Sequence, residues 1–409
     1  MKSISTFLFI FLLKTISLSA QCTERLLLDG KEDLTAYGMD TTQHWWAITT
    51  PFSERYRLTV DSVATGVYSQ ILPPVFSPDG NVWATFAFEN QQYFLLKKDT
   101  ALPLNCTEVQ QIFFSADSRI AGVAVRVGTE DVIRFAEREI RTTNRFGKVY
   151  ISPGGERVAY TVQRGTQSAL FVNFTEVAQM EEIKPIGFWN DGEFLYAGRS
   201  GKQWTVFKNK KELSGMAADI GDVAVNATGT VAAAVVKLFN GRSQLLIFSD
   251  EYYEPLKGKE YDGITDLVLH PQLALAVFKA TLRGVTHIVQ NTAEYAGGTI
   301  TGKPQYSSDG KDVFFAGEDN DSFINMNGQR FSLKNRIAAD GAYAFAPGKK
   351  SIAFASSSTL VVQNFEKETM RAGLMVDQVI SPRYNRFLKR YETLGRINQR
   401  LYLISCPVQ

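Results

Sequence analysis

The sequence predicts an all-β fold built from about ten copies of one short repeat. The first observation is a turn that recurs about every 37 residues and whose clearest copy is Ser77-Pro78-Asp79-Gly80. The second is an apolar residue directly before each turn and another six residues after its first position. The third is that an apolar period of 3.6 residues, typical of an amphipathic helix, persists nowhere. A period in the range of roughly 20–50 residues, sustained along a chain, indicates a repeat architecture.

The first position of each turn, which we call the anchor position, aligns the repeats. Successive anchor positions are separated by 37, 38, 37, 37, 37, 44, 37, 39 and 35 residues. They are Asp40, Ser77, Ser115, Ser152, Trp189, Asn226, His270, Ser307, Ala346 and Ser381. The residue six positions later is apolar in every repeat, which predicts that it lies in the core. These residues are Trp46, Trp83, Ala121, Val158, Leu195, Ala232, Ala276, Val313, Ile352 and Phe387.

Each repeat has room for four short strands. Asp, Asn and Gly at the anchor turns are residues that close tight turns between strands, the first two by side-chain hydrogen bonds and Gly by adopting positive φ. A third strand is clearest at residues 93–96, 169–172, 245–248 and 360–362, and about ten residues remain for a fourth. Four-stranded units repeated in this way form the blades of a β-propeller. Ten units exceed the usual four to eight or so blades, so one wide ring and two smaller rings are both open.

The chain ends predict that the ring is closed by its terminal strands. The last repeat begins near Val379 and has room for about three strands, whereas an apolar stretch at residues 25–28 precedes the first anchor position. We expect this stretch to supply the missing strand, because a propeller closed in this way leaves no open edge. An antiparallel pairing with residues 399–406 places Cys22 opposite Cys406. That pairing predicts a Cys22–Cys406 disulfide and leaves Cys106 as a free thiol.

The first 20 residues have the features of an export signal. Lys2 precedes an apolar stretch at residues 4–13, and small residues end the segment before Gln21. The apolar stretch is too short to span a bilayer. Lipid attachment at Cys22 is disfavoured because Gln21 is larger than the residue that lipoprotein signals require there. The predicted organisation is therefore a signal peptide at residues 1–20 and a propeller at residues 21–409, located in the periplasm or secreted, with no membrane span.

Composition and motifs exclude several classes of function. The net charge is +2, and no long run of Lys or Arg provides the basic patch of a nucleic-acid-binding protein. No Gly-x-Ser-x-Gly elbow occurs, and the three histidines, His44, His270 and His287, are far apart in the repeat series. The acidic segment at residues 318–322 lacks the spacing and the glycine of a calcium loop. We therefore predict no catalytic residue, no metal ligand and no cofactor.

The interval of 44 residues marks an insertion into a regular array. It contains Tyr252, Tyr253 and Tyr261, within the segment Asp250-Glu251-Tyr252-Tyr253-Glu254-Pro255 and the residues that follow. Insertions in repeat proteins usually form loops, and exposed aromatic residues dominate many binding surfaces. These three tyrosines are the predicted binding residues. The alternative is a longer hairpin with no binding role.

The turn motif also resembles that of a known family. Phe76-Ser77-Pro78-Asp79-Gly80, with weaker copies at residues 114–117, 151–154 and 306–309, is similar to the blade motif of TolB-type propellers. The resemblance implies an exported, non-enzymatic protein-interaction module with an envelope or outer-membrane protein partner, as part of an envelope assembly or secretion machine. Two alternatives remain open. One is a carbohydrate- or peptide-binding or hydrolytic site in the central channel, and the other is the detached propeller of a peptidase.

Overall fold

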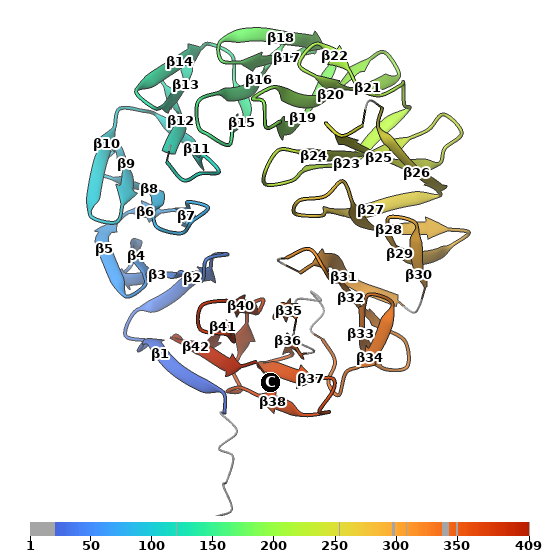
Figure 1. The fold of residues 1–409 in the computed structure, drawn as a ribbon. Helices are drawn as coiled ribbons and strands as arrows, with labels where there is room; N and C mark the ends of the chain where they lie inside the picture. Colours follow the sequence, from blue (N-terminus) through green and yellow to red (C-terminus); the bar gives the residue numbers. More distant parts are fainter. Residues whose placement is uncertain are drawn as a thin grey trace, which may run out of the picture.

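The chain forms a single ring of ten β-sheets (Figure 1). The computed structural model describes residues 21–119, 121–252, 254–296, 299–307, 309–337, 343–348 and 351–408. The predicted β-propeller is confirmed, and the alternative of two smaller rings is excluded. The predicted signal peptide at residues 1–20 and Tyr253 lie outside the described residues. Among the residues that are described, no helix is long and apolar enough to cross a membrane.

The first five blades contain the strands between residues 33 and 212. Blade 1 consists of β2 (Asp33–Met39), β3 (Trp45–Phe52), β4 (Arg55–Val60) and β5 (Val63–Tyr68). Blade 2 consists of β6 (Gln70–Ile71), β7 (Val75–Phe76), β8 (Trp83–Glu89), β9 (Gln92–Lys97) and β10 (Thr100–Leu104). Blade 3 consists of β11 (Glu108–Phe114), β12 (Ala121–Val127), β13 (Glu130–Phe135) and β14 (Arg138–Thr142). Blade 4 consists of β15 (Phe146–Ile151), β16 (Val158–Arg164), β17 (Gln167–Val172) and β18 (Thr175–Met180). Blade 5 consists of β19 (Glu182–Phe188), β20 (Phe194–Ser200), β21 (Gln203–Lys208) and β22 (Lys211–Glu212).

The remaining blades complete the ring. Blade 6 consists of β23 (Asp219–Val225), β24 (Val231–Lys237), β25 (Ser243–Ser249) and β26 (Leu256–Tyr261). Blade 7 consists of β27 (Gly263–Leu269), β28 (Ala276–Leu282), β29 (Val285–Gln290) and β30 (Ala293–Ala296). Blade 8 consists of β31 (Thr299–Tyr306), β32 (Val313–Glu318), β33 (Ser322–Met326) and β34 (Gln329–Ser332). Blade 9 consists of β35 (Tyr343–Phe345), β36 (Ser351–Ser356), β37 (Thr359–Asn364) and β38 (Met370–Ala372). Blade 10 consists of β39 (Gln378–Val379), β40 (Arg383–Asn385), β41 (Arg390–Ile397), β42 (Arg400–Pro407) and β1 (Thr23–Leu28).

Within each blade the strands form an antiparallel meander whose first strand faces the middle of the ring (Figure 1). The first strand is broken in two blades. In blade 2, β6 and β7 both pair with β8, and Pro73 and Pro74 lie between them. In blade 10, β39 and β40 both pair with β41, and Pro382 lies between them. Proline has no N–H to donate to the neighbouring strand, which explains both interruptions.

The ring is closed by the two ends of the chain, as predicted. β1 is the outermost strand of blade 10 and pairs antiparallel with β42, with Thr23 opposite Ser405. Cys22 and Cys406 form a disulfide with their Cα atoms 4.1 Å apart. Cys106 is a half-buried free thiol.

The apolar core is divided among the interfaces between consecutive blades, which we call seams. Ten clusters of buried residues occupy the ten seams. In the seam between blades 10 and 1, for example, Leu34 and Trp45 pack with Leu394 and Leu401. Each sheet thus packs both of its faces against its neighbours.

Two blades shift the predicted core position by one residue. The anchor turns of blades 1 and 5 are one residue shorter than that of blade 2. As a result, Trp45 and Phe194 pack toward the preceding blade, whereas Trp46 and Leu195 pack toward the following blade. Leu195 and Trp46 thus contribute to the core as predicted, but from the opposite face of the strand compared with the corresponding residues of the other repeats.

The last repeat needs a larger correction. Phe387, the predicted core residue, is 76% exposed. The hairpin of blade 10 pairs Asn385 with Arg390, so its anchor position is Asn385 rather than Ser381. The segment Ser381-Pro382 has the same residues as the start of the turn motif, but it lies in the interruption between β39 and β40. With Asn385 as the anchor position, the last interval is 39 residues, and Tyr391, which is fully buried, occupies the core position.

Candidate binding site

The anchor turns share hydrogen bonds that account for their Ser, Asp and Gly residues by turn structure alone. Ser77 Oγ donates to Asp79 Oδ1 at 2.7 Å, and the N–H of Gly80, whose φ is +76°, donates to the carbonyl oxygen of Ser77 at 2.8 Å. The bond from Ser77 lowers the pKa of Asp79 to about 2, so this carboxylate is ionised near neutral pH. The same Ser–Asp bond recurs in blades 3 and 8. Ser, Asp and Gly in these turns therefore have a structural role.

A pocket of about 860 Å³ lies at the inner edge of the ring, on the face that carries the anchor turns. We call this face the anchor-turn face and the cavity the central pocket. The anchor turns of blades 1 and 2 form one side, and the first strands of blades 8, 9 and 10 form the other. The residues that line it include His44, Asp79, Tyr306, Phe314, Tyr343, Phe345, Arg383, Tyr384, Arg386 and Phe387.

Two buried hydrogen-bond donors of the central pocket have no partner among the described residues. They are the Nε atom of Arg383 and the hydroxyl group of Tyr306. Burial lowers the pKa of the Arg383 guanidinium and raises the pKa of the Tyr306 phenol. Leaving a buried polar group without a partner costs free energy. Both atoms are shielded from solvent, and their residues line the same cavity, so they are the polar groups at this cavity for which the described residues supply no partner.

The carboxylates near these donors accept hydrogen bonds from other groups. Asp40 raises the pKa of Arg383 through its charge, but its own oxygens accept hydrogen bonds from the backbone N–H of His44, at 2.6 Å, and from the hydroxyl of Thr42. Asp79 is held within its own turn. In the part of the chain that the structure describes, Arg383 and Arg386 form no ion pair with a carboxylate. The two guanidinium groups are thus free of direct ion pairs, although the carboxylates of Asp79 and Asp40 lie near them.

Aromatic rings form much of the wall of the central pocket. Phe314 and Phe345 stack with their ring centroids 3.5 Å apart. The hydroxyl of Tyr343 donates to the carbonyl oxygen of Lys303 at 2.9 Å, which holds its ring in place. The Arg386 guanidinium lies 4.9 Å from the centroid of the exposed Phe387 ring. Phe314 and Tyr343 are almost fully buried in the seam between blades 8 and 9, whereas Phe345 and Tyr384 are partly exposed and Phe387 is largely exposed. Exposed aromatic rings beside a guanidinium suit a ligand with both an apolar or sugar-like face and an anionic group.

The histidines near this pocket have structural partners. His44 is hydrogen-bonded through Nδ1 to the carboxylate of Asp61 and stacks against Phe76 at 5.9 Å. His270 Nδ1 accepts the backbone N–H groups of Gln272, at 3.0 Å, and Leu273, at 2.9 Å, which closes its turn. No group of three His, Cys, Asp or Glu residues within the described ranges is placed to hold a metal ion.

The 44-residue interval holds a second cavity on the anchor-turn face. The seven extra residues are divided between the loops at residues 238–242 and 250–255 of blade 6. Tyr252, which is 44% exposed, lines a pocket of about 520 Å³ together with Trp189 and Lys208 of blade 5. Trp189 Nε1 donates to Asp250 at 2.8 Å, and the Lys208 ammonium lies 3.8 Å from the same carboxylate. The inserted loop is therefore fastened across the seam between blades 5 and 6.

The tyrosines predicted to bind a partner have different environments. Tyr261 is 2% exposed in β26 and belongs to the core of the seam between blades 6 and 7. Its hydroxyl donates to Glu294 at 2.8 Å, and burial raises its pKa. Since Tyr253 is outside the described residues, Tyr252 is the tyrosine of this segment for which the structure shows an accessible ring.

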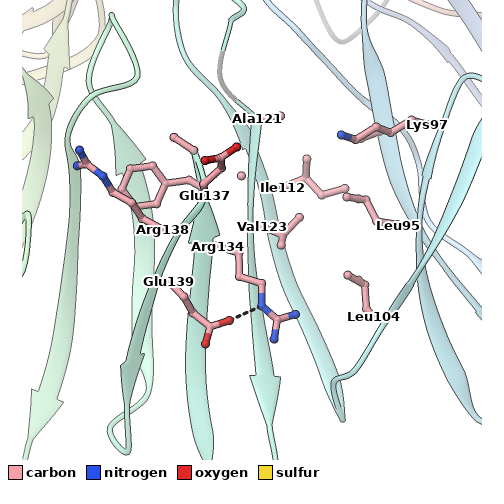
Figure 2. A pocket seen from close by; sticks show the side chains of 14 residues that line it. Leu95, Lys97, Leu104, Ile112, Ala121, Val123, Arg134, Glu137, Arg138 and Glu139 are labelled. Carbon is pink, nitrogen blue, oxygen red and sulfur yellow. Dashed lines mark hydrogen bonds and ion pairs between the residues drawn. The ribbon is translucent and has the colours of Figure 1, made fainter.

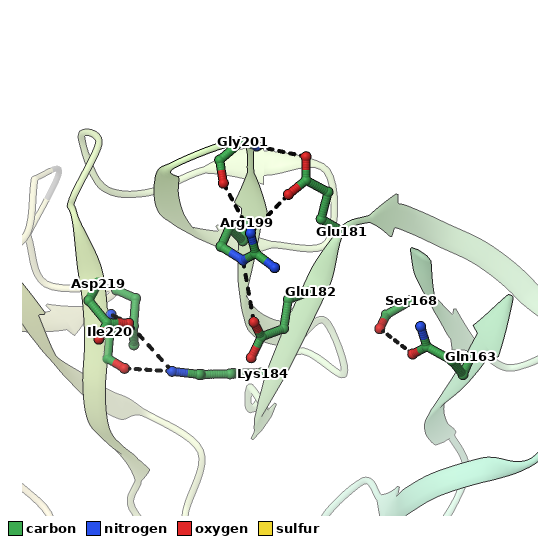
Figure 3. A network of polar contacts seen from close by, with 9 residues as sticks. All are labelled: Gln163, Ser168, Glu181, Glu182, Lys184, Arg199, Gly201, Asp219 and Ile220. Carbon is green, nitrogen blue, oxygen red and sulfur yellow. Dashed lines mark hydrogen bonds and ion pairs between the residues drawn. The ribbon is translucent and has the colours of Figure 1, made fainter. Parts of the chain in front are cut away.

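The opposite face carries a charged network that is satisfied within itself (Figure 3). Arg199 of β20 bonds to Glu181 at 2.9 Å and to Glu182 at 3.3 Å. Lys184 donates to the carbonyl oxygen of Ile220 at 2.8 Å and lies 4.5 Å from the ring centroid of Trp204. The bond from Lys184 to Ile220 joins blades 5 and 6, whereas the other contacts lie within blade 5 or at its first strand. The contrast with the central pocket is that here the cations have protein partners.

Sequence reasoning did not identify Arg383 or Tyr306. Arg383 follows Ser381-Pro382, the pair to which the last anchor position was wrongly assigned. Tyr306 was considered only as the apolar residue that precedes an anchor turn. The irregular spacing of the last repeat, 35 residues, was the available signal that this blade departs from the pattern.

Comparison with known proteins supplies no family assignment. No family model matches the chain, and no curated protein matches it. Three of the similar solved structures are a eukaryotic initiation factor (13% identity, 72% of this chain and 85% of that chain, TM-score 0.48), the β-propeller domain of the Trilobed protease from Pyrococcus furiosus (11%, 65% and 95%, 0.34) and TolB from Acinetobacter baumannii (10%, 75% and 76%, 0.30). These likenesses concern the fold alone.

Proposed function

We propose that this protein is an exported, non-enzymatic propeller that binds another macromolecule of the cell envelope through its anchor-turn face. In this proposal residues 1–20 direct export and are removed, and residues 21–409 act in the periplasm or outside the cell. The central pocket is the main recognition site, and the Tyr252 loop is a second contact on the same face. The observation that carries the proposal is the pair of buried donors, on Arg383 and Tyr306, that have no partner among the described residues.

The physical basis is electrostatic and geometric. A guanidinium that is partly removed from water without a carboxylate partner is destabilising, and an anionic group of a partner relieves that cost on binding. The aromatic walls are held by ring stacking and by the hydrogen bond of Tyr343, so little side-chain ordering is needed when a partner enters. An acidic segment of an envelope protein meets both requirements.

A second candidate function is capture of a small acidic carbohydrate or peptide in the same pocket. The observation that favours it is the volume of about 860 Å³, which falls within the range of roughly 300–1,000 Å³ typical of small-ligand sites. The two candidates differ in what the protein carries when it is isolated. A macromolecular partner co-purifies as a stable complex, whereas a small ligand leaves a monomer whose binding a defined compound can reproduce.

The test is purification of the native protein from its envelope, followed by identification of what co-elutes. The double variant Arg383→Gln, Arg386→Gln should lose the partner. The matched control is Arg119→Gln, which removes an 85%-exposed arginine from the anchor turn of blade 3, on the same face but outside the pocket. Equal partner recovery with the double variant and the wild type would refute the central pocket as the recognition site. A monomer that turns over glycans or peptides would refute the non-enzymatic role, and residues 1–20 retained in the exported protein would refute the signal peptide.

A further inference from the structure

The seam between blades 2 and 3 is packed differently from the other nine. Two positions on the second strand of each blade pack against the preceding blade: the core position and the residue two positions further on. In eight blades at least one of them is aromatic, as with Trp45, Trp83, Tyr160, Phe194, Phe278, Phe315, Phe354 and Tyr391.

Blades 6 and 3 are the two exceptions. In blade 6 both residues are alanine, and Trp189 and Trp204 of blade 5 occupy the space. In blade 3 the residues are Ala121 and Val123, and the aromatic rings of that seam, on Phe86, Tyr93 and Phe114, lie at other positions. Because side chains of protein cores normally fill their space, a missing aromatic ring leaves a cavity.

The cavity is visible between the two blades (Figure 2). Its volume is about 410 Å³, and we call it the seam slot. Leu95 and Leu104 line it from blade 2, and Ile112 and Val123 line it from blade 3. These residues come from inner as well as outer strands, so the slot runs across the blades rather than into one point. A pocket with apolar walls that opens to solvent at a charged rim suits a ligand with an apolar part and a polar end.

The rim of the seam slot adds a charge. Lys97 is half-buried there and forms no ion pair with any carboxylate of the described chain. The other rim charges are Arg134, which pairs with Glu139 at 2.7 Å, Arg138, whose guanidinium donates to a carbonyl oxygen at 3.5 Å, and Glu137, which is exposed on a turn. The rim therefore carries one more positive than negative charge, and the Lys97 ammonium is the cation left for a ligand.

We propose that the seam slot binds the alkyl chain of a medium-chain carboxylate, with its carboxylate group at Lys97. The apolar walls accept the chain, and the ammonium compensates the anionic head group. A straight chain suits a slot that extends across neighbouring strands better than a compact ring does. This site is separate from the central pocket and does not depend on the function proposed above.

The test is calorimetric titration of the mature protein with hexanoate, octanoate and decanoate. Each added methylene that enters the slot should tighten binding about fourfold, the value that corresponds to transfer of one methylene from water. The Lys97→Gln variant should weaken octanoate binding about tenfold or more and leave octanol binding unchanged. The control Lys98→Gln, on the exposed neighbouring residue, should bind octanoate as the wild type does.

The slot itself is tested by filling it. Val123→Phe introduces the ring that blades 7, 8 and 9 carry at the same position, and it should abolish binding while raising the melting temperature. If Val123→Phe does not fold, Ala121→Val, which copies Val158 of blade 4, should reduce binding of the longer chains most. Affinity that is independent of chain length, or undiminished in a folded filling variant, would overturn the proposal. Equal loss of octanol and octanoate binding in Lys97→Gln would overturn the role of Lys97. If the seam slot were occupied only by an apolar side chain of a protein partner, the choice of ligand would be overturned.

Discussion

Removing the disulfide that closes the ring should lower the free energy of unfolding substantially. The Cys22–Cys406 disulfide joins residues 384 positions apart, close to the two ends of the described chain. In the chain-entropy account, a crosslink that closes a loop of this length restricts the unfolded chain by about 6 kcal/mol. The paired strand β1 does not replace this effect, because four of its six residues are exposed and its pairing is lost on unfolding. We therefore expect the variant Cys22→Ser, Cys406→Ser to unfold at a much lower urea concentration than the wild type.

The assay is equilibrium unfolding in urea, followed by the fluorescence of the five tryptophans. Cys106→Ser is the control, since it removes the free thiol without touching the closure. Thiol titration of the denatured, unreduced wild type should find one free thiol. A free energy of unfolding within about 1 kcal/mol of the wild type for the double variant would refute the argument, as would three free thiols in the wild type.

Three further predictions concern single features. Because the folded pKa of Asp79 is lowered to about 2, its carboxylate stabilises the fold above the unfolded pKa and this contribution is lost as the pH falls toward 2; Asp79→Asn should therefore show a smaller drop in melting temperature between pH 5 and pH 2 than the wild type, and an identical drop would contradict the role of the turn carboxylate. Tyr391→Phe leaves the buried N–H of Ala346 without its acceptor at 3.0 Å, and should cost about 1–3 kcal/mol in urea unfolding, whereas an unchanged midpoint would show that the bond is dispensable. Replacing Tyr252 and Tyr253 together by Ala should weaken partner binding while leaving the melting temperature nearly unchanged; full binding would remove the loop from the interface, and unfolding would show that the tyrosines belong to the core.

The fold was predictable from the sequence because every repeat carries the same pattern of turn and apolar residues. An error in one copy of the turn does not alter the period, so the blade count and the strand that closes the ring followed from the spacing and from the apolar stretch before the first turn. The core positions were harder. Shortening the turn by one residue in blades 1 and 5 exchanges the two faces of a strand, since alternate residues of a strand point to opposite sides. Nothing in the local sequence of Trp45 and Trp46 distinguishes the two registers.

The central pocket was not predictable because it is assembled from distant blades. Its donors, on Tyr306 and Arg383, lie 77 positions apart, and its wall is completed by the turn that holds His44, at the other end of the chain. Closure of the ring brings these segments together, so no linear motif encodes the site. The binding prediction for Tyr261 had a different weakness. An irregular interval identifies an insertion, but it does not show which of its residues belong to the loop and which to the fourth strand.

The last blade provides a direct comparison between the sequence pattern and the structure. The pattern assigns the turn of blade 10 to Ser381, which is exposed, whereas the structure assigns it to Asn385, which is 7% exposed. Asn385 Oδ1 accepts the backbone N–H groups of Phe387, at 3.1 Å, and Leu388, at 2.9 Å. Its Nδ2 donates at 2.8 Å to the buried carboxylate of Glu392.

Removing these bonds should separate the two assignments. Asn385→Ala leaves a buried carboxylate short of a donor and two turn N–H groups without an acceptor, which should cost about 2–3 kcal/mol of unfolding free energy. Ser381→Ala removes only an exposed hydroxyl and should stay within about 0.5 kcal/mol of the wild type. Urea unfolding of both variants decides the matter. If Ser381→Ala were the more destabilising change, the turn would lie where the motif places it, and the first strand of blade 10, with Arg383 on the wall of the central pocket, would have to be placed differently.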